Sequence, residues 1–471
     1  MLKRKFQVIA YILAAIVLLS GFFFYIYSYL KQNIKLPSTN EEAITLTIAE
    51  QLNKNPNQLS GDDYNNITEL HLSNLSGIAI KVQKWKSFLA KYHIINISYI
   101  ESDLNTLRKM PNLETLSIES STITNIDALS YLKKLKSLRL SNIKTDNIKA
   151  IAGLKNLSEL YFYAPNIRSL KPLRNLNNLQ SLSFSAEKIK DIKPLKRLTN
   201  LKELKIYKSN LTNIAAIETL KNLQILEIFY TNVSDLEPIE NLTNLQRLAL
   251  LETNVTDFEP IEGLKNLREV NYINLENTKS IFDLSPFKEL TNLQILYIAP
   301  AEVSDLNPLK KLTNLKMLVL SKSKISDISA LKELVNLEEL SISNSEVTEL
   351  SNLEPLEKLK KLSKLSLLKT QISNLEPLKE LANLQNLKIN ESKLSNLEPI
   401  NELINLENIT IAKVPISDIE SLMEIPNLQN LSIRQCENIT QEQVDDLRKA
   451  FPKIQIYFQS EQYKPPWNTG N

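Results

Sequence analysis

The sequence predicts an α/β solenoid preceded by one transmembrane helix. Two observations lead to this fold class. An apolar element of the form NLxxLxI recurs along most of the 471 residues, and an uncharged apolar run of 25 residues lies near the N-terminus. A short repeat kept over more than 300 residues indicates one array of stacked units, in place of the roughly three domains that the length alone suggests.

The repeat has a nearly constant period. Twelve of the fourteen intervals between its starting leucines are 22 residues long. The interval from Leu267 to Leu293 is 26 residues and that from Leu337 to Leu362 is 25, which we interpret as small insertions in loops. The starting leucines are Leu113, Leu135, Leu157, Leu179, Leu201, Leu223, Leu245, Leu267, Leu293, Leu315, Leu337, Leu362, Leu384, Leu406 and Leu428.

Each repeat contains a strand pattern followed by a return pattern. In the repeat that begins at Leu223, apolar positions 1, 4 and 6 end in a period of two, which predicts a short strand with one buried face. Positions 11, 14, 17 and 20 are spaced by threes, which suits an inward ridge on a turn or 3₁₀ return. Pro238 follows Asp235 by three residues, and an Asp or Asn side chain there can accept from a free backbone N–H. Since no unit buries its apolar side alone, stacking must create the core.

The pattern L-x-x-L-x-L followed by I-x-x-I-x-x-L-x-x-L resembles the leucine-rich repeat of bacterial internalins, the short-repeat subclass, over about residues 41–458. The resemblance implies a curved horseshoe with a parallel sheet on its concave face, short helical or 3₁₀ returns on its convex face, and protein partners on the concave face. At the ninth position the family usually has Asn, whereas hydroxyl side chains, which bond the turn more weakly, prevail here. The residues concerned are Ser121, Ser209, Thr231, Thr253, Ser323, Ser345, Thr370, Ser392 and, with a thiol, Cys436.

Both ends of the array are predicted to be capped. Residues 41–53 predict an amphipathic helix, which resembles the N-terminal cap of internalin-like proteins, and irregular repeats follow. Residues 439–451 predict a helix with Thr440 as its N-cap, followed by a last strand. The predicted division is a cytoplasmic N-terminus (1–5), a transmembrane signal-anchor helix (6–30), a linker (31–40), the N-terminal cap and irregular repeats (41–112), leucine-rich repeats (113–435), a C-terminal helical capping repeat (436–458) and a tail (459–471).

Residues 6–30 determine the predicted localisation. A helix of this length exceeds the ~30 Å hydrocarbon core of a bilayer, and the basic residues before it favour a cytoplasmic N-terminus. We therefore expect a single-pass protein of the cell membrane, in contact with the lipid bilayer through residues 6–30, with extracytoplasmic repeats. The alternative is a secreted protein after signal cleavage, although the apolar part of a signal peptide is typically only about 7 to 15 residues long.

The composition argues against catalytic chemistry. Six Gly, two His and one Cys exclude phosphate-binding glycine loops, multi-cysteine zinc sites and intramolecular disulfides. We expect no enzyme activity, no cofactor, no metal and no small-molecule substrate. A net charge of +3 over the whole chain gives no footprint for nucleic acid, so we expect none to bind. Scarce glycine also suggests that the repeat seldom requires a positive φ.

The candidate site is a contiguous apolar and aromatic ridge on the outward face of the predicted strands. Stacked strands lie about 4.8 Å apart, and exposed Tyr and Phe are favoured as binding hot spots. Two other interpretations stay open: the side chains only stabilise the sheet by cross-strand packing, or the register is shifted and they point inward. The predicted partner-binding residues are Tyr161, Tyr163, Tyr207, Ile225, Phe229, Tyr230, Leu251, Ile273, Tyr297, Met317 and Val319.

The sequence thus predicts a membrane-anchored extracytoplasmic protein that recognises a protein partner through its concave face. The internalin resemblance implies adhesion or host interaction. The alternative is a cell-envelope scaffolding or glycan-binding protein, because acids and amides such as Glu227 and Asn271 beside Tyr297 are compatible with sugar binding.

Overall fold

The computed structural model describes residues 52–73, 94–96, 104–119, 123–274, 282–300, 302–344 and 349–459, together with Thr45, Ile48 and Ala49. The chain divides into two compact units. The first contains Met1–Leu135 and Arg139–Thr145, and the second contains Lys136–Leu138 and Asp146–Asn471. Strand β4 (Ser137–Ser141) contributes residues to both.

The first unit contains the N-terminal cap. Helix α3 (Gly61–Asn65) begins with a capping box, in which the Ser60 side chain accepts from the Asp63 N–H and the Asp63 side chain accepts from the Ser60 N–H. Of the helix predicted over 41–53, Thr45, Ile48 and Ala49 are helical, and the other residues up to Gln51 lie outside the described residues. The further elements are η1 (Pro56–Gln58), β1 (Glu69–Ser73), β2 (Ile94–Asn96), η2 (Asn105–Lys109), β3 (Thr115–Glu119) and η3 (Asp127–Tyr131), and β1 pairs in parallel with both β2 and β3.

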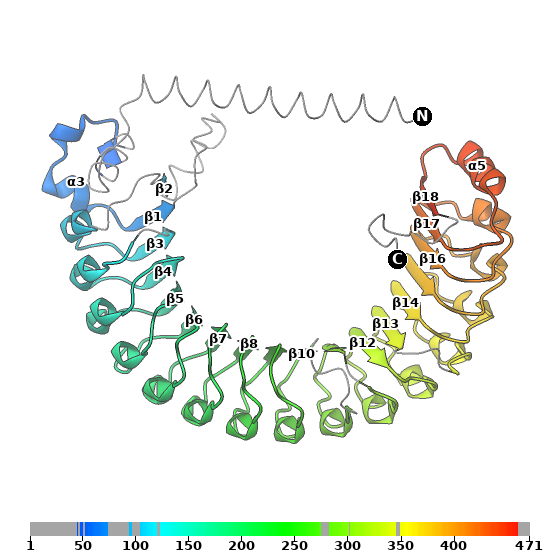
Figure 1. Cartoon of the computed structure of the whole chain (residues 1–471), viewed down its shortest axis with the longest axis horizontal. Coiled ribbons are helices and arrows are strands. Elements are labelled where there is room, and N and C mark those ends of the chain that lie inside the picture. The colour runs from blue at the N-terminus through cyan, green and yellow to red at the C-terminus, as the bar shows by residue number, and fades with distance from the viewer. Residues whose placement is uncertain are drawn as a thin grey trace, which may run out of the picture. The chain divides into compact units, whose positions relative to one another are not determined.

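The second unit is a parallel sheet whose strands follow one another in chain order. Figure 1 shows these strands on the inner side of the unit and the 3₁₀ helices on its outer side. The strands are β5 (Glu159–Tyr163), β6 (Ser181–Ser185), β7 (Glu203–Tyr207), β8 (Ile225–Phe229), β9 (Arg247–Leu251), β10 (Glu269–Ile273), β11 (Ile295–Ala299), β12 (Met317–Ser323), β13 (Glu339–Asn344), β14 (Lys364–Leu368), β15 (Asn386–Asn390), β16 (Asn408–Ala412), β17 (Asn430–Arg434) and β18 (Gln455–Gln459).

From β4 to β17 one 3₁₀ helix returns the chain between successive strands, as the spacing by threes predicts. The returns are η4 (Lys149–Gly153), η5 (Lys171–Leu173), η6 (Lys193–Arg197), η7 (Ala215–Thr219), η8 (Glu237–Ile239), η9 (Glu259–Ile261), η10 (Ser285–Phe287), η11 (Asn307–Leu309), η12 (Ser329–Glu333), η13 (Glu354–Leu356), η14 (Glu376–Leu378), η15 (Glu398–Ile400) and η16 (Glu420–Glu424). We call the sheet side of this unit the concave face and the 3₁₀ side the convex face.

The predicted inward positions form the core. In the repeat that begins at Leu223, all seven of them are at most 2% exposed. Burying one such aliphatic side chain contributes about 1.5 to 3 kcal/mol, so the core of each repeat is the main stabilising term. The register also survives both long intervals, because Glu269 pairs with Ile295 and Glu339 with Lys364. The extra residues therefore lie in loops, as predicted.

Side-chain amides and carboxylates of Asn and Asp secure each return. Oδ1 of Asp235 accepts from the Glu237 N–H at 2.8 Å, as predicted, and Pro238 takes a place in η8 where no donor is needed. The Asn before the first leucine of a repeat has a second role. Asn222 donates to the Thr199 carbonyl at 2.9 Å, 23 residues earlier, so the bond joins two repeats.

The hydroxyls at the ninth position bond the turns only in part. Those of Ser209, Thr253 and Thr370 are buried with no hydrogen-bond partner among the described residues. In the two repeats that contain the insertions, a buried Asn at the eighth position bonds the backbone of the turn instead. Asn274 donates to the Thr253 carbonyl at 2.6 Å, and Oδ1 of Asn344 accepts from the Ile325 N–H at 3.0 Å.

The expectation that the repeat seldom requires a positive φ is wrong. The eighth position, directly after or at the end of the strand, repeatedly adopts φ between 45° and 58° without glycine. Left-handed backbone costs most L-residues about 1–2 kcal/mol, so the turn that leads the chain from strand to return imposes this conformation. The residues are Asn142, Lys208, Tyr230, Glu252, Lys322, Lys369, Glu391, Lys413 and Gln435.

The C-terminal closure agrees with the sequence. Helix α5 (Gln441–Ala450) begins with a capping box between Thr440 and Gln443, and its Val444 and Leu447 are buried. Strand β18 pairs with β17 after it. Cys436 is fully buried, and this burial raises the pKa of its thiol, so it is a packing residue.

The predicted transmembrane helix requires a correction. Within the part of the chain that the structure describes, no helix has the length and apolar character needed to cross a membrane. Residues 6–30 lie outside that part. The correction keeps the repeat solenoid and withdraws the predicted transmembrane helix, and with it the single-pass localisation and the bilayer contact. The exact domain boundaries and secretion stay predictions.

We expect Thr370→Val to raise the free energy of unfolding by about 1 kcal/mol, because valine keeps the shape and removes a buried hydroxyl without a partner. Asn344→Ala should lower it by about 1–3 kcal/mol, since the Ile325 N–H loses its acceptor. Urea unfolding followed by circular dichroism measures both. If Thr370→Val destabilises as much as Asn344→Ala, this account of the ninth position is incorrect.

Candidate functional site

The structure places ten of the eleven predicted residues on strands with their side chains on the concave face, so the shifted-register interpretation is wrong. They alternate along the strands with fully buried side chains. Ten are half-buried, and Tyr230, directly after β8, is 50% exposed. Tyr161 and Tyr163 lie on β5, Tyr207 on β7, Ile225 and Phe229 on β8, Leu251 on β9, Ile273 on β10, Tyr297 on β11, and Met317 and Val319 on β12.

The seventh position gives an uninterrupted apolar row. Tyr207, Phe229, Leu251 and Ile273 are direct register partners on four neighbouring strands. The rings of Tyr207 and Phe229 pack edge to face with centroids 5.1 Å apart. Together with Tyr230, these four residues form a surface that we call the concave patch.

The predicted ridge is divided rather than continuous. Tyr297 pairs with Val319, and Ile295 pairs with Met317, which makes a second apolar group on β11 and β12. In the row of fifth positions, however, Ser183, Lys205, Glu227, Ala249 and Asn271 separate this group from Tyr161. Four of these five residues are polar or charged.

The interruption contains a set of ion pairs that the repeat pattern did not predict. Lys205 Nζ lies 2.6 Å from Glu203 Oε1 and 3.8 Å from Glu227 Oε1. Arg247 continues the series, with Nε 3.2 Å from Glu227 Oε1 and Nη1 3.1 Å from Glu269 Oε2. We call these five residues the charged ladder. Opposite charges at the third and fifth positions of neighbouring repeats, 20 to 22 residues apart, are the sequence pattern that could have revealed it.

Glu227 links the charged ladder to the concave patch. The residue is only 6% exposed, and its Oε2 accepts from the Tyr207 hydroxyl at 2.9 Å. Burial and this hydrogen bond to Glu227 both raise the pKa of Tyr207, so the phenol keeps its proton. Tyr207 is therefore fixed in the sheet, which supports cross-strand stabilisation as one of its roles.

Glu203 ends the charged ladder on β7. Its partial burial alone raises the pKa, but hydrogen bonds from Lys205 and from Ser181, at 2.6 Å, outweigh it, and the pKa lies below its usual value. The carboxylate stays charged at neutral pH. It consequently holds Lys205 and Ser181 in place on the face of the sheet.

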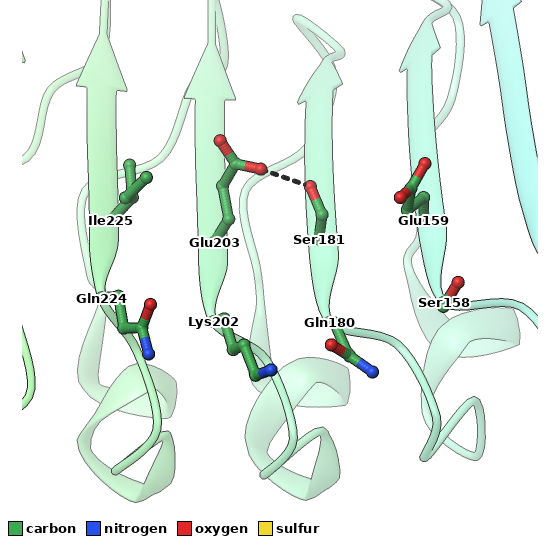
Figure 2. Close-up of a pocket in the computed structure, with 8 residues that line it drawn as sticks. All are labelled: Ser158, Glu159, Gln180, Ser181, Lys202, Glu203, Gln224 and Ile225. Atoms are coloured by element: carbon green, nitrogen blue, oxygen red, sulfur yellow. Dashed lines mark hydrogen bonds between the residues drawn. The ribbon is translucent and has the colours of Figure 1, made fainter.

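A shallow depression lies beside the charged ladder, where β5 to β8 begin. Figure 2 shows the Ser181–Glu203 hydrogen bond across it. Its volume is about 320 Å³. Hydroxyl, amide and charged groups line it, and Ile225 is its one predicted site residue. The lining residues are Ser158, Glu159, Gln180, Ser181, Lys202, Glu203, Gln224 and Ile225.

Among the described residues no group of three or more His, Cys, Asp or Glu is arranged to hold a metal ion. His71 belongs to β1, although its side chain lies outside the described part, as does His93.

The lowered pKa of Glu203 predicts a pH effect on stability. Below the ordinary value of 4.5 the unfolded chain binds a proton more readily than the folded one, so this stability is present above that pH and is lost as the pH falls through the folded pKa. We expect Glu203→Gln to flatten the fall in the urea midpoint between about pH 5 and pH 3. Glu240→Gln, at an exposed convex position, is the control and should leave the slope unchanged. Equal slopes for wild type and Glu203→Gln would contradict the assignment.

No protein-family model matches the chain, and no curated protein matches it in sequence. Solved structures do. An internalin of Listeria monocytogenes is 22% identical over 83% of this chain and 94% of that one, with a TM-score of 0.54. A leucine-rich repeat protein of Leptospira interrogans is 23% identical over 77% and 100%, with a TM-score of 0.57. A plant peptide hormone receptor, solved in a complex, is 19% identical over 72% and 64%, with a TM-score of 0.52.

Likeness at this identity shows the fold alone. It agrees with the 22-residue pattern, the parallel sheet and the 3₁₀ returns of the described residues. The chain therefore has the fold of a leucine-rich repeat solenoid, similar to that of the internalin.

Proposed function

We propose that this protein recognises a protein partner through the concave patch. The patch is an apolar surface on four neighbouring strands, bordered by the charged ladder. An apolar centre with a polar border is the common anatomy of protein interfaces, and Tyr and Phe are enriched there. The leucine-rich repeat fold supports the proposal, because one plant protein of this fold is a receptor for a peptide hormone.

The exposed ring of Tyr230 is the main support for the proposal. Its φ of 55° is the conformation that the turn imposes on this position in eight other repeats. Those repeats carry Asn, Lys, Glu or Gln here, whereas Tyr230 leaves an aromatic ring 50% exposed. Its hydroxyl has no hydrogen-bond partner among the described residues. An exposed aromatic ring at a position that is otherwise polar supports contact with a partner.

The neighbours of Tyr230 are already ordered. Tyr207 is held by Glu227 and by the ring of Phe229. A surface fixed before binding loses less side-chain entropy when it binds, which favours affinity. Sheet stabilisation and partner binding are thus compatible roles for Tyr207, whereas Tyr230 supports binding alone.

The biological role that we propose for this recognition is adhesion to another cell or interaction with a host. Its support is the resemblance of the repeat to that of internalins. Glycan binding is the competing function, and the polar depression beside Ile225 is the feature that favours it.

The proposal predicts that Leu251→Ser weakens capture of a partner by at least tenfold, because it places a hydroxyl in the centre of the patch. Leu368→Ser is a matched control: Leu368 is also half-buried at the seventh position, but lies on β14. Both variants are compared with wild type in quantitative pull-downs from envelope and host extracts. A protein lost only with Leu251→Ser supports the patch. Equal recovery with both variants, or recovery of glycan alone, contradicts the proposal.

Tyr230→Asn separates binding from stability. Asparagine tolerates the left-handed conformation, so the free energy of unfolding should stay equal or rise by a few tenths of a kcal/mol. Partner affinity should fall at least tenfold, because the exposed ring is lost. Urea unfolding and surface plasmon resonance with the captured partner measure the two effects. A destabilised variant with normal affinity would assign Tyr230 to the fold instead.

A further inference from the structure

Charge is distributed very unevenly along the second unit. Residues 146–208 contain thirteen Lys and Arg against five Asp and Glu, whereas residues 209–274 contain four against ten. The net charge of +3 for the whole chain conceals this local excess. The net charge of the whole chain is therefore not sufficient to judge whether this unit binds a polyanion.

The excess positive charge gathers on the convex face. Six exposed cations lie on or directly after three consecutive 3₁₀ helices, on the outer side of β5 to β7 in Figure 1. We call them the basic convex patch: Lys149, Lys171, Arg174, Lys193, Lys196 and Arg197. The positions equivalent to Lys193 and Lys196 carry Ala215 and Glu218 on the next 3₁₀ helix, η7. On η8 and η9 they carry Glu237, Glu240, Glu259 and Glu262, so the patch ends after η6.

The cations of the basic convex patch are not neutralised by their surroundings. None of the six takes part in an ion pair among the described residues, whereas Lys205 on the opposite face has two. Two of the five acids of 146–208, Glu159 and Glu203, lie on strands of the concave face. Asp191 accepts from the Lys193 backbone N–H as the cap of η6. The field outside this part of the convex face is therefore positive.

We propose that the basic convex patch binds a flexible, linear phosphate polymer. Such a polymer carries condensed counterions, and their release on contact with Lys and Arg favours binding without any specific groove. The guanidinium groups of Arg174 and Arg197 add forked hydrogen bonds to phosphate. A flexible chain can also follow a convex surface. A flat membrane would contact fewer repeats of that surface.

The acidic positions on η8 and η9 set the limit of the site. A polyanion is repelled beyond η6, so its contacts are restricted to the three repeats of the basic convex patch. The binding is expected to be modest in affinity and strongly dependent on salt. It is independent of the concave patch, because the two surfaces lie on opposite sides of the sheet.

The test uses inorganic polyphosphate and a 20-nucleotide oligothymidylate as probes, each labelled for fluorescence anisotropy. Both are phosphate chains, and the comparison distinguishes an anhydride chain from a nucleic acid backbone as the preferred source. We expect the Kd of at least one probe to rise by about a hundredfold between 50 and 200 mM NaCl. In the quadruple variant Lys171→Glu, Arg174→Glu, Lys193→Glu and Lys196→Glu, the Kd should rise at least tenfold at 50 mM NaCl.

A matched control changes the net charge by the same amount elsewhere on the convex face. It carries Lys310→Glu, Lys311→Glu, Lys332→Glu and Lys358→Glu, all at exposed positions. Its Kd should stay within twofold of wild type, and circular dichroism should show both variants folded. Equal losses in both variants, no binding of either probe, or binding only to vesicles of phosphatidylglycerol and phosphatidylcholine would each overturn the proposal.

Discussion

The structure depends on one constraint: no repeat can bury its own apolar side. A strand of five residues and a 3₁₀ turn of three to five offer one apolar edge each, and the core closes only when the next repeat is stacked on it. Asn222 and its equivalents reinforce this stacking, because each bonds a carbonyl of the preceding repeat. The 22-residue period is thus a packing requirement, and insertions are tolerated only where the register of the sheet is untouched.

The same constraint produces the functional surface. Because alternate side chains of every strand must enter the core, the remaining ones are forced onto the concave face in straight rows, one residue per strand. A row is apolar or charged according to what each repeat carries at that position. The concave patch lies on the row of seventh positions, and the charged ladder lies on the rows of third and fifth positions beside it. The hydrogen bond from Tyr207 to Glu227 joins the two. Recognition in this molecule is consequently a property of neighbouring repeats rather than of any single motif.

Periodicity was sufficient to predict the strands, the returns, the Asx caps and the outward position of every candidate residue. It was also sufficient for the capping box at Thr440, since that motif is local. The left-handed eighth position escaped prediction because it arises from the closure of the turn, which accepts Lys, Glu or Tyr as well as Gly. The charged ladder escaped as well, because its pairs depend on side-chain reach between strands, as with Arg247 between Glu227 and Glu269. Whole-chain charge, in turn, concealed the basic convex patch.

Partner recognition through the concave patch depends most on Tyr230, whose ring we expect to contact the partner protein. Hydroxyl-radical footprinting of the chain with and without its captured partner tests this contact, because Tyr457 on β18 serves as an internal reference. Tyr230, directly after β8, is 50% exposed, and Tyr457 is 53% exposed. We expect the partner to protect Tyr230 from oxidation and to leave the oxidation of Tyr457 unchanged. Protection of Tyr457 alone, or equal oxidation of Tyr230 in both states, would contradict it.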